Sequence, residues 1–162
     1  MPMNIARRLV AASSAVAIAL LGVFGSAAEA APRVNEERYL AEFHVDGRLI
    51  QCSVIGKSSY ELRRVVDDEG VVTWWSALEA STRVVDDDVE CTRLVFVQTL
   101  LDWQLPDFKR GEASTVEYNG LDASVQVSLE QAVRGMVGIH YVWFLCDEFV
   151  GGCGYIFETN PK

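Results

Sequence analysis

The clearest pattern of hydrophobic and polar positions lies around residue 40, where Tyr39, Ala41, Phe43 and Val45 alternate with Leu40, Glu42 and His44. A period of two is typical of a half-buried β-strand. Asp46-Gly47 follows as a preferred two-residue hairpin turn, and residues 48–55 are the predicted return strand. Because this turn sets Val45 opposite Arg48, one face should collect Tyr39, Ala41, Phe43, Val45, Ile50, Cys52 and Val54. The other face should collect Glu42, His44, Gln51 and Ser53.

Further strands are predicted from apolar runs that lie between turn signals. They are expected over residues 60–66, 71–78, 91–101, 116–118, 123–127, 139–145 and 154–158. Residues 67–70 end in glycine and supply the turn of a second hairpin, and Asn119-Gly120 supplies the turn of a third. The last two strands are expected to be joined through the segment 146–153.

One helix is predicted, over residues 128–138. Ser128 and Gln131 have the spacing of a capping box. An apolar stripe follows at helical spacing: Leu129, Ala132, Val133, Met136 and Val137. Gly135 weakens this helix, and a continued strand is the alternative. The pattern as a whole predicts a mainly β fold, a small antiparallel β-sandwich or half-open barrel with at most one short helix. An α+β fold, with a helix packed on one antiparallel sheet, is the alternative.

The first thirty residues have a different character from the rest. Arg7 and Arg8 precede an apolar run over residues 9–24, and small residues lead to Ala28-Glu29-Ala30. This is the pattern of a secretory signal peptide, and the run is shorter than the roughly 20 residues that span a bilayer. We expect cleavage after Ala30, a loose arm over 31–38 and one disulfide-stabilised globular domain over 39–162. The protein is then secreted or periplasmic, with no membrane attachment after cleavage.

Composition limits the class of partner. The chain carries 14 Lys and Arg against 23 Asp and Glu, a net charge of −9. Nucleic-acid binding needs a basic surface, so a nucleic-acid partner is not expected.

Four cysteines in an exported chain indicate two disulfides, and three pairings are possible. Cys52–Cys91 with Cys146–Cys153 is favoured, because a short loop containing Gly151 and Gly152 separates the last two cysteines. No C-x₂₋₄-C pair indicates zinc, so no metal is expected there.

Few residues indicate catalysis. Glu42 and His44 share one face of a strand and could form an acid–base pair or seat a metal, but two polar residues on a solvated sheet face are the favoured interpretation. His140 lies in an apolar run and is expected to be a core or rim histidine, bound by a backbone carbonyl, rather than a catalytic residue.

An acidic run raises the question of calcium. Asp86, Asp88 and Glu90 match the first three ligand positions of an EF-hand loop, but Cys91 and Val97 stand where that loop needs Gly and Glu. A solvated acidic turn is the default, and a different calcium site that adds residues 67–69 is the alternative. No cofactor is otherwise expected.

The segment between the last two cysteines is the candidate binding site, with Asp147, Glu148, Phe149 and Val150 as its residues. A disulfide would pre-organise this loop, and aromatic anchors are typical of binding hot spots. The leading hypothesis is an exported, non-enzymatic binding module, an inhibitor or an immunity-type protein. Its acidic surface suits a basic protein partner.

Two other classes of function remain open. One is an exported carboxylate-dependent hydrolase, with or without Ca²⁺, that uses Glu42 and His44. The other is a structural component of the envelope. Exposed tryptophans could line a sugar site, but the four tryptophans fit core positions equally well.

Overall fold

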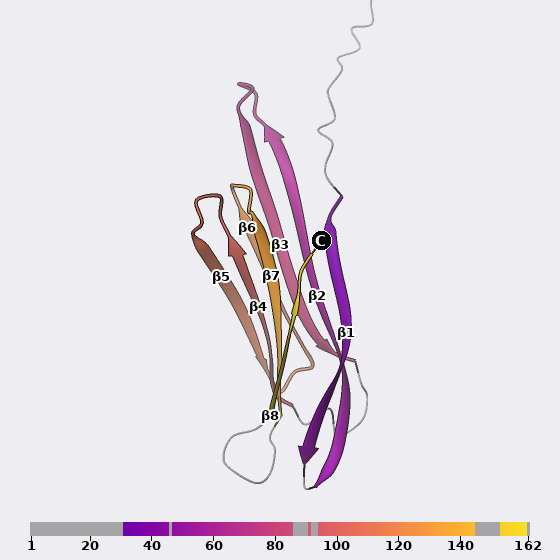
Figure 1. Cartoon of the computed structure of the whole chain (residues 1–162). Coiled ribbons are helices and arrows are strands. Elements are labelled where there is room, and N and C mark those ends of the chain that lie inside the picture. Colours follow the sequence, from indigo (N-terminus) through magenta and orange to yellow (C-terminus); the bar gives the residue numbers. More distant parts are fainter. Residues whose placement is uncertain (1–30, 46, 86–90, 92–93, 145–152, 162) are drawn as a thin grey trace, which may run out of the picture.

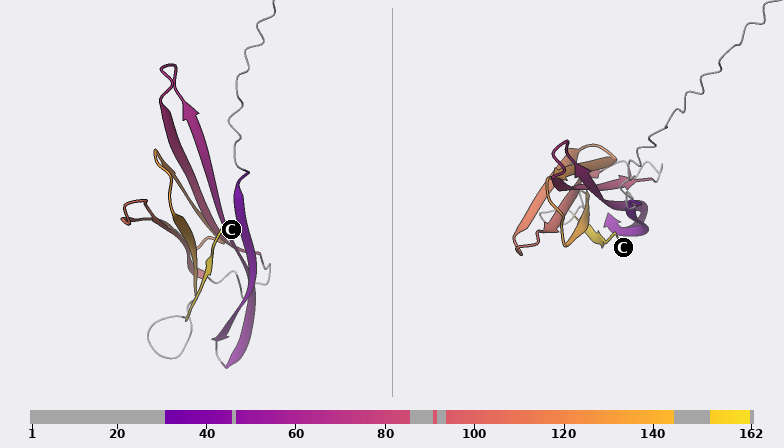
Figure 2. Two further views of the ribbon diagram at one scale, coloured as in Figure 1. Left: turned by 45° about the horizontal axis from the view of Figure 1, so that its top comes forward. Right: turned by 90° about the horizontal axis from the view of Figure 1, so that it is seen from above.

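The computed structural model describes residues 31–45, 47–85, 91, 94–144 and 153–161, and its regular structure there is entirely β. The strands are β1 (Arg33–Val45), β2 (Arg48–Val66), β3 (Val72–Val84), β4 (Leu94–Gln104), β5 (Arg110–Tyr118), β6 (Asp122–Leu129), β7 (Gly135–Phe144) and β8 (Cys153–Thr159). They form two four-stranded antiparallel sheets, β1-β2-β3-β6 (sheet A) and β5-β4-β7-β8 (sheet B). The sheets lie face to face without closing into a barrel (Figures 1 and 2). The predicted mainly β sandwich is confirmed.

The first hairpin has the predicted register. Val45 lies opposite Arg48 and Ala41 lies opposite Cys52. The buried side chains are Ala41, Phe43, Ile50, Cys52 and Val54, and Tyr39 and Val45 pack against them. Gly47 has a φ of 73°, a left-handed conformation that glycine adopts without steric cost. Turn chemistry and alternation therefore suffice to define this element.

The second hairpin is longer than predicted, because β2 continues without a break from the first hairpin into it. Pairing with β1 ends at Tyr60, and pairing with β6 begins only at Ser76. The remaining part of the hairpin therefore projects from the sandwich as a two-stranded ribbon, seen at the top of Figure 1.

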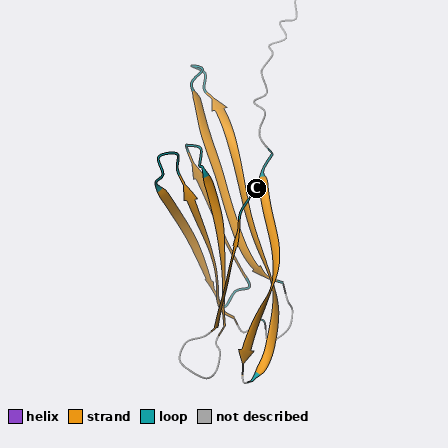
Figure 3. Cartoon of the chain, in the orientation of Figure 1, coloured by secondary structure: helices purple, strands orange, loops and turns teal. Residues whose placement is uncertain are grey.

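The predicted helix over residues 128–138 is wrong. β6 ends at Leu129, a short turn follows, and β7 begins at Gly135 (Figure 3). Leu129 and Met136 both face the same apolar cluster, but from two strands in opposite sheets. A chain that crosses between sheets can thus place apolar residues at a spacing that resembles one helical face.

The predicted hairpin around Asn119-Gly120 is also wrong. β5 pairs with β4 in sheet B, whereas β6 pairs with β3 in sheet A. Asn119 adopts a φ of 55°, so the turn signal marks a real reversal, but that reversal carries the chain from one sheet to the other. A turn motif specifies a bend and leaves the pairing partner open.

The expected loose arm over 31–38 differs from the structure, in which β1 begins at Arg33. Arg33 lies opposite Tyr60 and Arg38 opposite Ile55. Most side chains of this segment are exposed, so backbone pairing with β2 orders it rather than apolar burial.

Two apolar clusters fill the space between the sheets. The larger contains Ala41, Phe43, Ile50, Cys52, Val54, Val84, Cys91, Val97, Ala123, Val142, Phe144 and Phe157. The smaller contains Leu78, Ala80, Leu101, Trp103, Val125 and Met136. On β3, β4 and β7 a buried polar residue separates the two clusters: Thr82, Thr99 and His140 respectively. The core is therefore divided by a polar layer.

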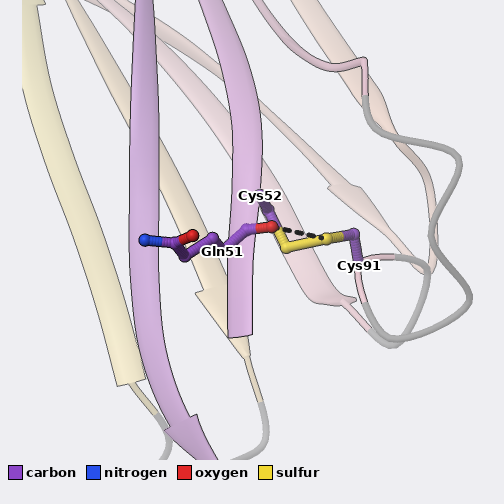
Figure 4. The surroundings of a disulfide bond; sticks show 3 residues. All are labelled: Gln51, Cys52 and Cys91. Atoms are coloured by element: carbon purple, nitrogen blue, oxygen red, sulfur yellow. Dashed lines mark hydrogen bonds between the residues drawn. A yellow bond between two sulfur atoms is a disulfide. The ribbon is translucent and has the colours of Figure 1, made fainter. Parts of the chain in front are cut away.

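The Cys52–Cys91 disulfide is present as predicted and joins β2 to the connection between β3 and β4 (Figure 4). Both cysteines are fully buried, with their Cα atoms 5.7 Å apart. Cys91 Sγ also lies 3.5 Å from the carbonyl oxygen of Gln51. Because a disulfide sulfur carries no proton, this is a van der Waals contact.

Candidate binding face

The binding loop predicted from the sequence, Asp147, Glu148, Phe149 and Val150, lies outside the described residues. So do Cys146 and the side chain of Cys153, and their pairing stays a prediction. The structure does place the two ends of this segment. Phe144 at the end of β7 lies opposite Cys153 at the start of β8, so residues 145–152 connect two paired strands at one end of sheet B.

The Glu42–His44 pair is on one exposed face of β1, as predicted. The carboxylate of Glu42 accepts a hydrogen bond from Gln51 Nε2 at 2.7 Å, across the first hairpin. This is a cross-strand pair on a solvated face.

The acidic residues weighed for calcium divide into two groups. Asp86, Asp88 and Glu90 lie outside the described residues. Asp67 is described, and its Oδ1 accepts backbone N–H groups from Glu69 at 3.0 Å and Val71 at 2.8 Å. This carboxylate closes the turn between β2 and β3. In the described part of the chain, no group of three or more His, Cys, Asp or Glu residues is arranged to hold a metal ion.

His140 is fully buried, and both of its ring nitrogens are bound. Nδ1 lies 2.8 Å from Thr82 Oγ1, and Nε2 lies 2.7 Å from Thr159 Oγ1. The expectation of a core histidine is confirmed, but its partners are threonine hydroxyls and not a backbone carbonyl. A ring with no exposed edge cannot contact a substrate.

The number of hydroxyl protons on the neighbouring threonines determines the tautomer of His140. Thr99 donates its only hydroxyl proton to the Ala123 carbonyl at 2.9 Å, and Thr82 Oγ1 lies 2.7 Å from Thr99 Oγ1. The single hydroxyl proton of Thr82 has two acceptors besides the ring, Thr99 Oγ1 and the Gln98 carbonyl at 3.2 Å, so Thr82 accepts a hydrogen bond from His140. The imidazole is neutral with its proton on Nδ1, and Thr159 donates to Nε2. Burial lowers the pKa of His140 from 6.5 to about 4, and the charge of Glu37 opposes this shift.

The outward side of sheet B carries a group of four aromatic side chains in mutual contact. We call it the aromatic face and define it as Phe96, Tyr118, Tyr141, Trp143 and Ile156. The strand registers set Tyr118 beside Phe96, Phe96 beside Trp143, and Tyr141 beside Ile156. Four neighbouring strands thus contribute to one continuous patch.

The rings of the aromatic face pack tightly against each other. The Phe96 ring centre lies 5.8 Å from that of Trp143 and 5.7 Å from that of Tyr141, with interplanar angles of 3° and 10°. Gly154 on β8 makes room for them, because a Cβ atom there would lie 2.5 Å from Tyr141 Oη and 2.9 Å from Trp143 Cε3. The patch is therefore pre-ordered, which limits the entropy that binding would cost.

The aromatic face is open to solvent at both sides. Tyr118 is 69 % exposed and Ile156 is 60 % exposed, whereas the three rings between them are half-buried. Large aromatic side chains in a contiguous exposed patch are typical of interaction sites. Trp143 lies next to Phe144, so the 145–152 connection leaves the sheet beside this patch.

The electrostatic surroundings of the face are acidic. Glu112 and Glu158 point outward on the same side of sheet B and are exposed. Asp102 also points outward there, and its Oδ2 binds Arg110 at 2.7 Å. Glu158 borders the patch, because it lies two residues from Ile156 on β8. Asp102, Arg110 and Glu112 lie farther along the same side of sheet B.

Sequence reasoning did not find the aromatic face, although a signal was available. β4 carries large apolar residues at both odd and even positions, for example Val97 and Leu101 inward and Phe96 and Leu100 outward. In a two-layer sandwich only one face of a strand can be covered. A strand that is apolar on both faces thus exposes one of them.

Within the described residues there is no helix of the length and apolarity that a membrane crossing requires. No protein-family model, no curated protein and no solved structure matches this chain.

Proposed function

We propose that the protein is an exported binding module that recognises a protein partner through the aromatic face and the adjoining connection 145–152. The observation that carries this proposal is the exposed, pre-ordered patch built around Phe96, Tyr141 and Trp143. The connection that contains the sequence-derived candidate, Phe149, begins directly after Phe144, the neighbour of Trp143 at the end of β7.

Export is supported by two independent features. Disulfides persist in oxidising compartments outside the cytoplasm, and Cys52–Cys91 is such a bond. The N-terminal thirty residues have the pattern of a signal peptide. A folded, disulfide-bonded β-sandwich outside the cell membrane suits a role in recognition.

The partner should be basic around an apolar centre. The chain has a net charge of −9, and the exposed carboxylate of Glu158 borders the aromatic face. Opposite charge at the rim of an interface speeds encounter and disfavours wrong partners. We therefore expect binding to slow as salt is raised.

The test is capture of the partner by the immobilised, oxidised protein from envelope and medium of the source cells, followed by mass spectrometry. We expect one stoichiometric partner. Ile156→Ser should lower its capture at least about tenfold, because the most exposed aliphatic contact of the face is lost. Leu40→Ser is the matched control, since Leu40 is 49 % exposed on the outward side of sheet A. It should leave capture unchanged.

The contribution of the connection is tested in the same assay. Phe149→Ala should weaken capture while leaving the melting temperature and the circular dichroism spectrum unchanged. Unchanged capture would remove the connection from the proposal. Equal capture by Ile156→Ser and the parent protein, or no partner with and without calcium, would refute the proposed function itself.

A further inference from the structure

A second surface lies on the opposite side of the sandwich, on the outward side of sheet A. Two adjoining hollows of about 320 Å³ and about 390 Å³ share Ala77 and Ser128 in their lining. Together they form what we call the sheet A groove. It runs from Lys57 and Gln126 at one end to Trp75 and Arg63 at the other. Each hollow has the size of a small-molecule site.

The groove exists because small side chains form its floor. Glu61, Ala77 and Ser128 lie side by side across β2, β3 and β6. Ala77 and Ser128 are short, whereas the next outward row contains the much larger pair Arg63 and Trp75. The height difference between adjacent rows creates the depression. No glycine or unusual backbone is needed.

Trp75 forms an apolar wall at the ribbon end. The side chain is 37 % exposed, because β6 ends at Leu129, opposite Ser76, and leaves Trp75 with a neighbouring strand on the β2 side alone. An indole that is fixed on a strand and uncovered on one side offers a flat apolar surface. Such a surface matches the C–H face of a sugar ring.

The polar groups of the groove are already balanced. Arg63 and Glu61 form a two-point ion pair at 2.7 and 2.9 Å, and Ser59 donates to Glu79 at 3.4 Å. With Lys57, the lining holds two cationic and two anionic side chains. A balanced lining gives no net attraction to a phosphate or a cation. It favours a neutral ligand with many hydroxyl groups, which the Glu79 carboxylate and the Gln126 amide can bind.

We propose that the sheet A groove binds a neutral oligosaccharide, with one sugar ring stacked on Trp75 and hydroxyl groups bound by Glu79 and Gln126. This site is independent of the aromatic face, since it lies on the other sheet. The protein would then attach to a glycan through one face while the other face stays free for its partner.

Titration of the intact oxidised protein with cellohexaose, chitohexaose and mannohexaose tests the proposal, with calorimetry and tryptophan fluorescence as readouts. We expect one of the three to bind and to change the fluorescence. Trp75→Ala should weaken that binding at least about tenfold, because the stacking surface is lost. Trp74→Ala is the matched control. Trp74 is the neighbouring residue, is 44 % exposed and points to the opposite side of the ribbon, so its loss should leave binding unchanged.

A second variant keeps the test decisive if Trp75→Ala perturbs the ribbon. Ala77→Leu fills the floor of the groove from a position on the sheet surface and should also abolish sugar binding. Ile156→Ser should leave sugar binding intact, which separates this site from the proposed partner face. The proposal is overturned if none of the three sugars binds, if Trp75→Ala and Ala77→Leu both bind like the parent, or if an extended peptide or an anionic polysaccharide is preferred.

Discussion

Protonation of His140 is unfavourable in the folded protein, because the ring has no contact with water and both nitrogens are hydrogen-bonded to threonine. A second proton would put a charge into the polar layer of the core and break the hydrogen bond that Thr159 donates to Nε2. The layer thus couples the charge state of one residue to the stability of the whole sandwich.

The stability of the fold should therefore depend on pH through His140. The folded-state pKa is about 4, below the ordinary value of 6.5. Between these values the unfolded chain binds a proton that the folded chain does not, so the free energy of unfolding falls as pH drops from about 6.5 to about 4. The full effect is on the order of 3 kcal/mol. Above pH 6.5 the protein keeps this stabilisation in full.

Urea unfolding at pH 7, 6, 5 and 4.5 measures this dependence. Comparison with His140→Phe isolates it, because carboxylates contribute equally to both proteins. The variant should be less stable at pH 7, with unbound threonine hydroxyls, and should show a shallower loss of stability on acidification. His44→Gln is the control at an exposed position. Parallel curves for the parent and His140→Phe would contradict the assignment.

The same layer requires a glycine beside it. A Cβ atom at Gly56 would lie 2.3 Å from Phe157 Cε2 and 2.6 Å from His140 Cδ2, both in buried side chains. Gly56→Ala should therefore lower the free energy of unfolding by about 1–3 kcal/mol. Gly135→Ala is the matched control, since nothing lies within 4 Å of its added carbon. Thermal unfolding of the two variants measures the difference, with a lower melting temperature expected for Gly56→Ala. Equal melting temperatures would refute the close packing around Gly56.

Among the strands, the β2–β3 hairpin has two ends that are stabilised by different interactions. At its turn, the β2–β3 hairpin is held by the pairing of its own two strands and by the hydrogen bonds of Asp67. The other end of β3 is held by Cys91, which follows it and is bonded to β2. The projecting ribbon can therefore present Trp75 because the opposite end of the same hairpin is tied down.

Removal of the disulfide should destabilise the protein without changing its sheets. The bond closes a loop with a sequence separation of 39, for which the chain-entropy estimate is about 4 kcal/mol. Cys52→Ala/Cys91→Ala should lose that amount in urea unfolding at pH 7. A loss under about 1 kcal/mol would mean that the unfolded chain is already restricted in this region.

Whether a sequence pattern lies within one hairpin or between the two sheets explains which predictions succeeded. The Asp46-Gly47 hairpin was predictable to the residue, because a two-residue turn determines register and the alternation independently agrees. The helix over 128–138 and the hairpin at Asn119-Gly120 were not, because both signals occur where the chain passes between sheets. Local patterns report bends and periods, and they do not report which strand will be the partner.

At the scale of the whole molecule, two outward surfaces lie on opposite sides of one core. Sheet B presents the aromatic face, and sheet A presents the groove that ends at Trp75. A sandwich keeps such surfaces apart and rigid, since each sheet is supported from behind by the shared apolar clusters. Two ligands could therefore be held at once without competing.

The sequence alone determined the β class, the first two hairpins and the apolar surroundings of His140, because alternation, turn residues and neighbouring side chains are local properties. It favoured the Cys52–Cys91 pairing among three possibilities, and the structure decided it. Only the tertiary structure decided which strands share a sheet, that Thr82 and Thr159 bind His140, and that Phe96 and Trp143 meet on an open face. These residues are far apart along the chain. Which side of a strand is covered depends on the second sheet, and no local pattern contains that information.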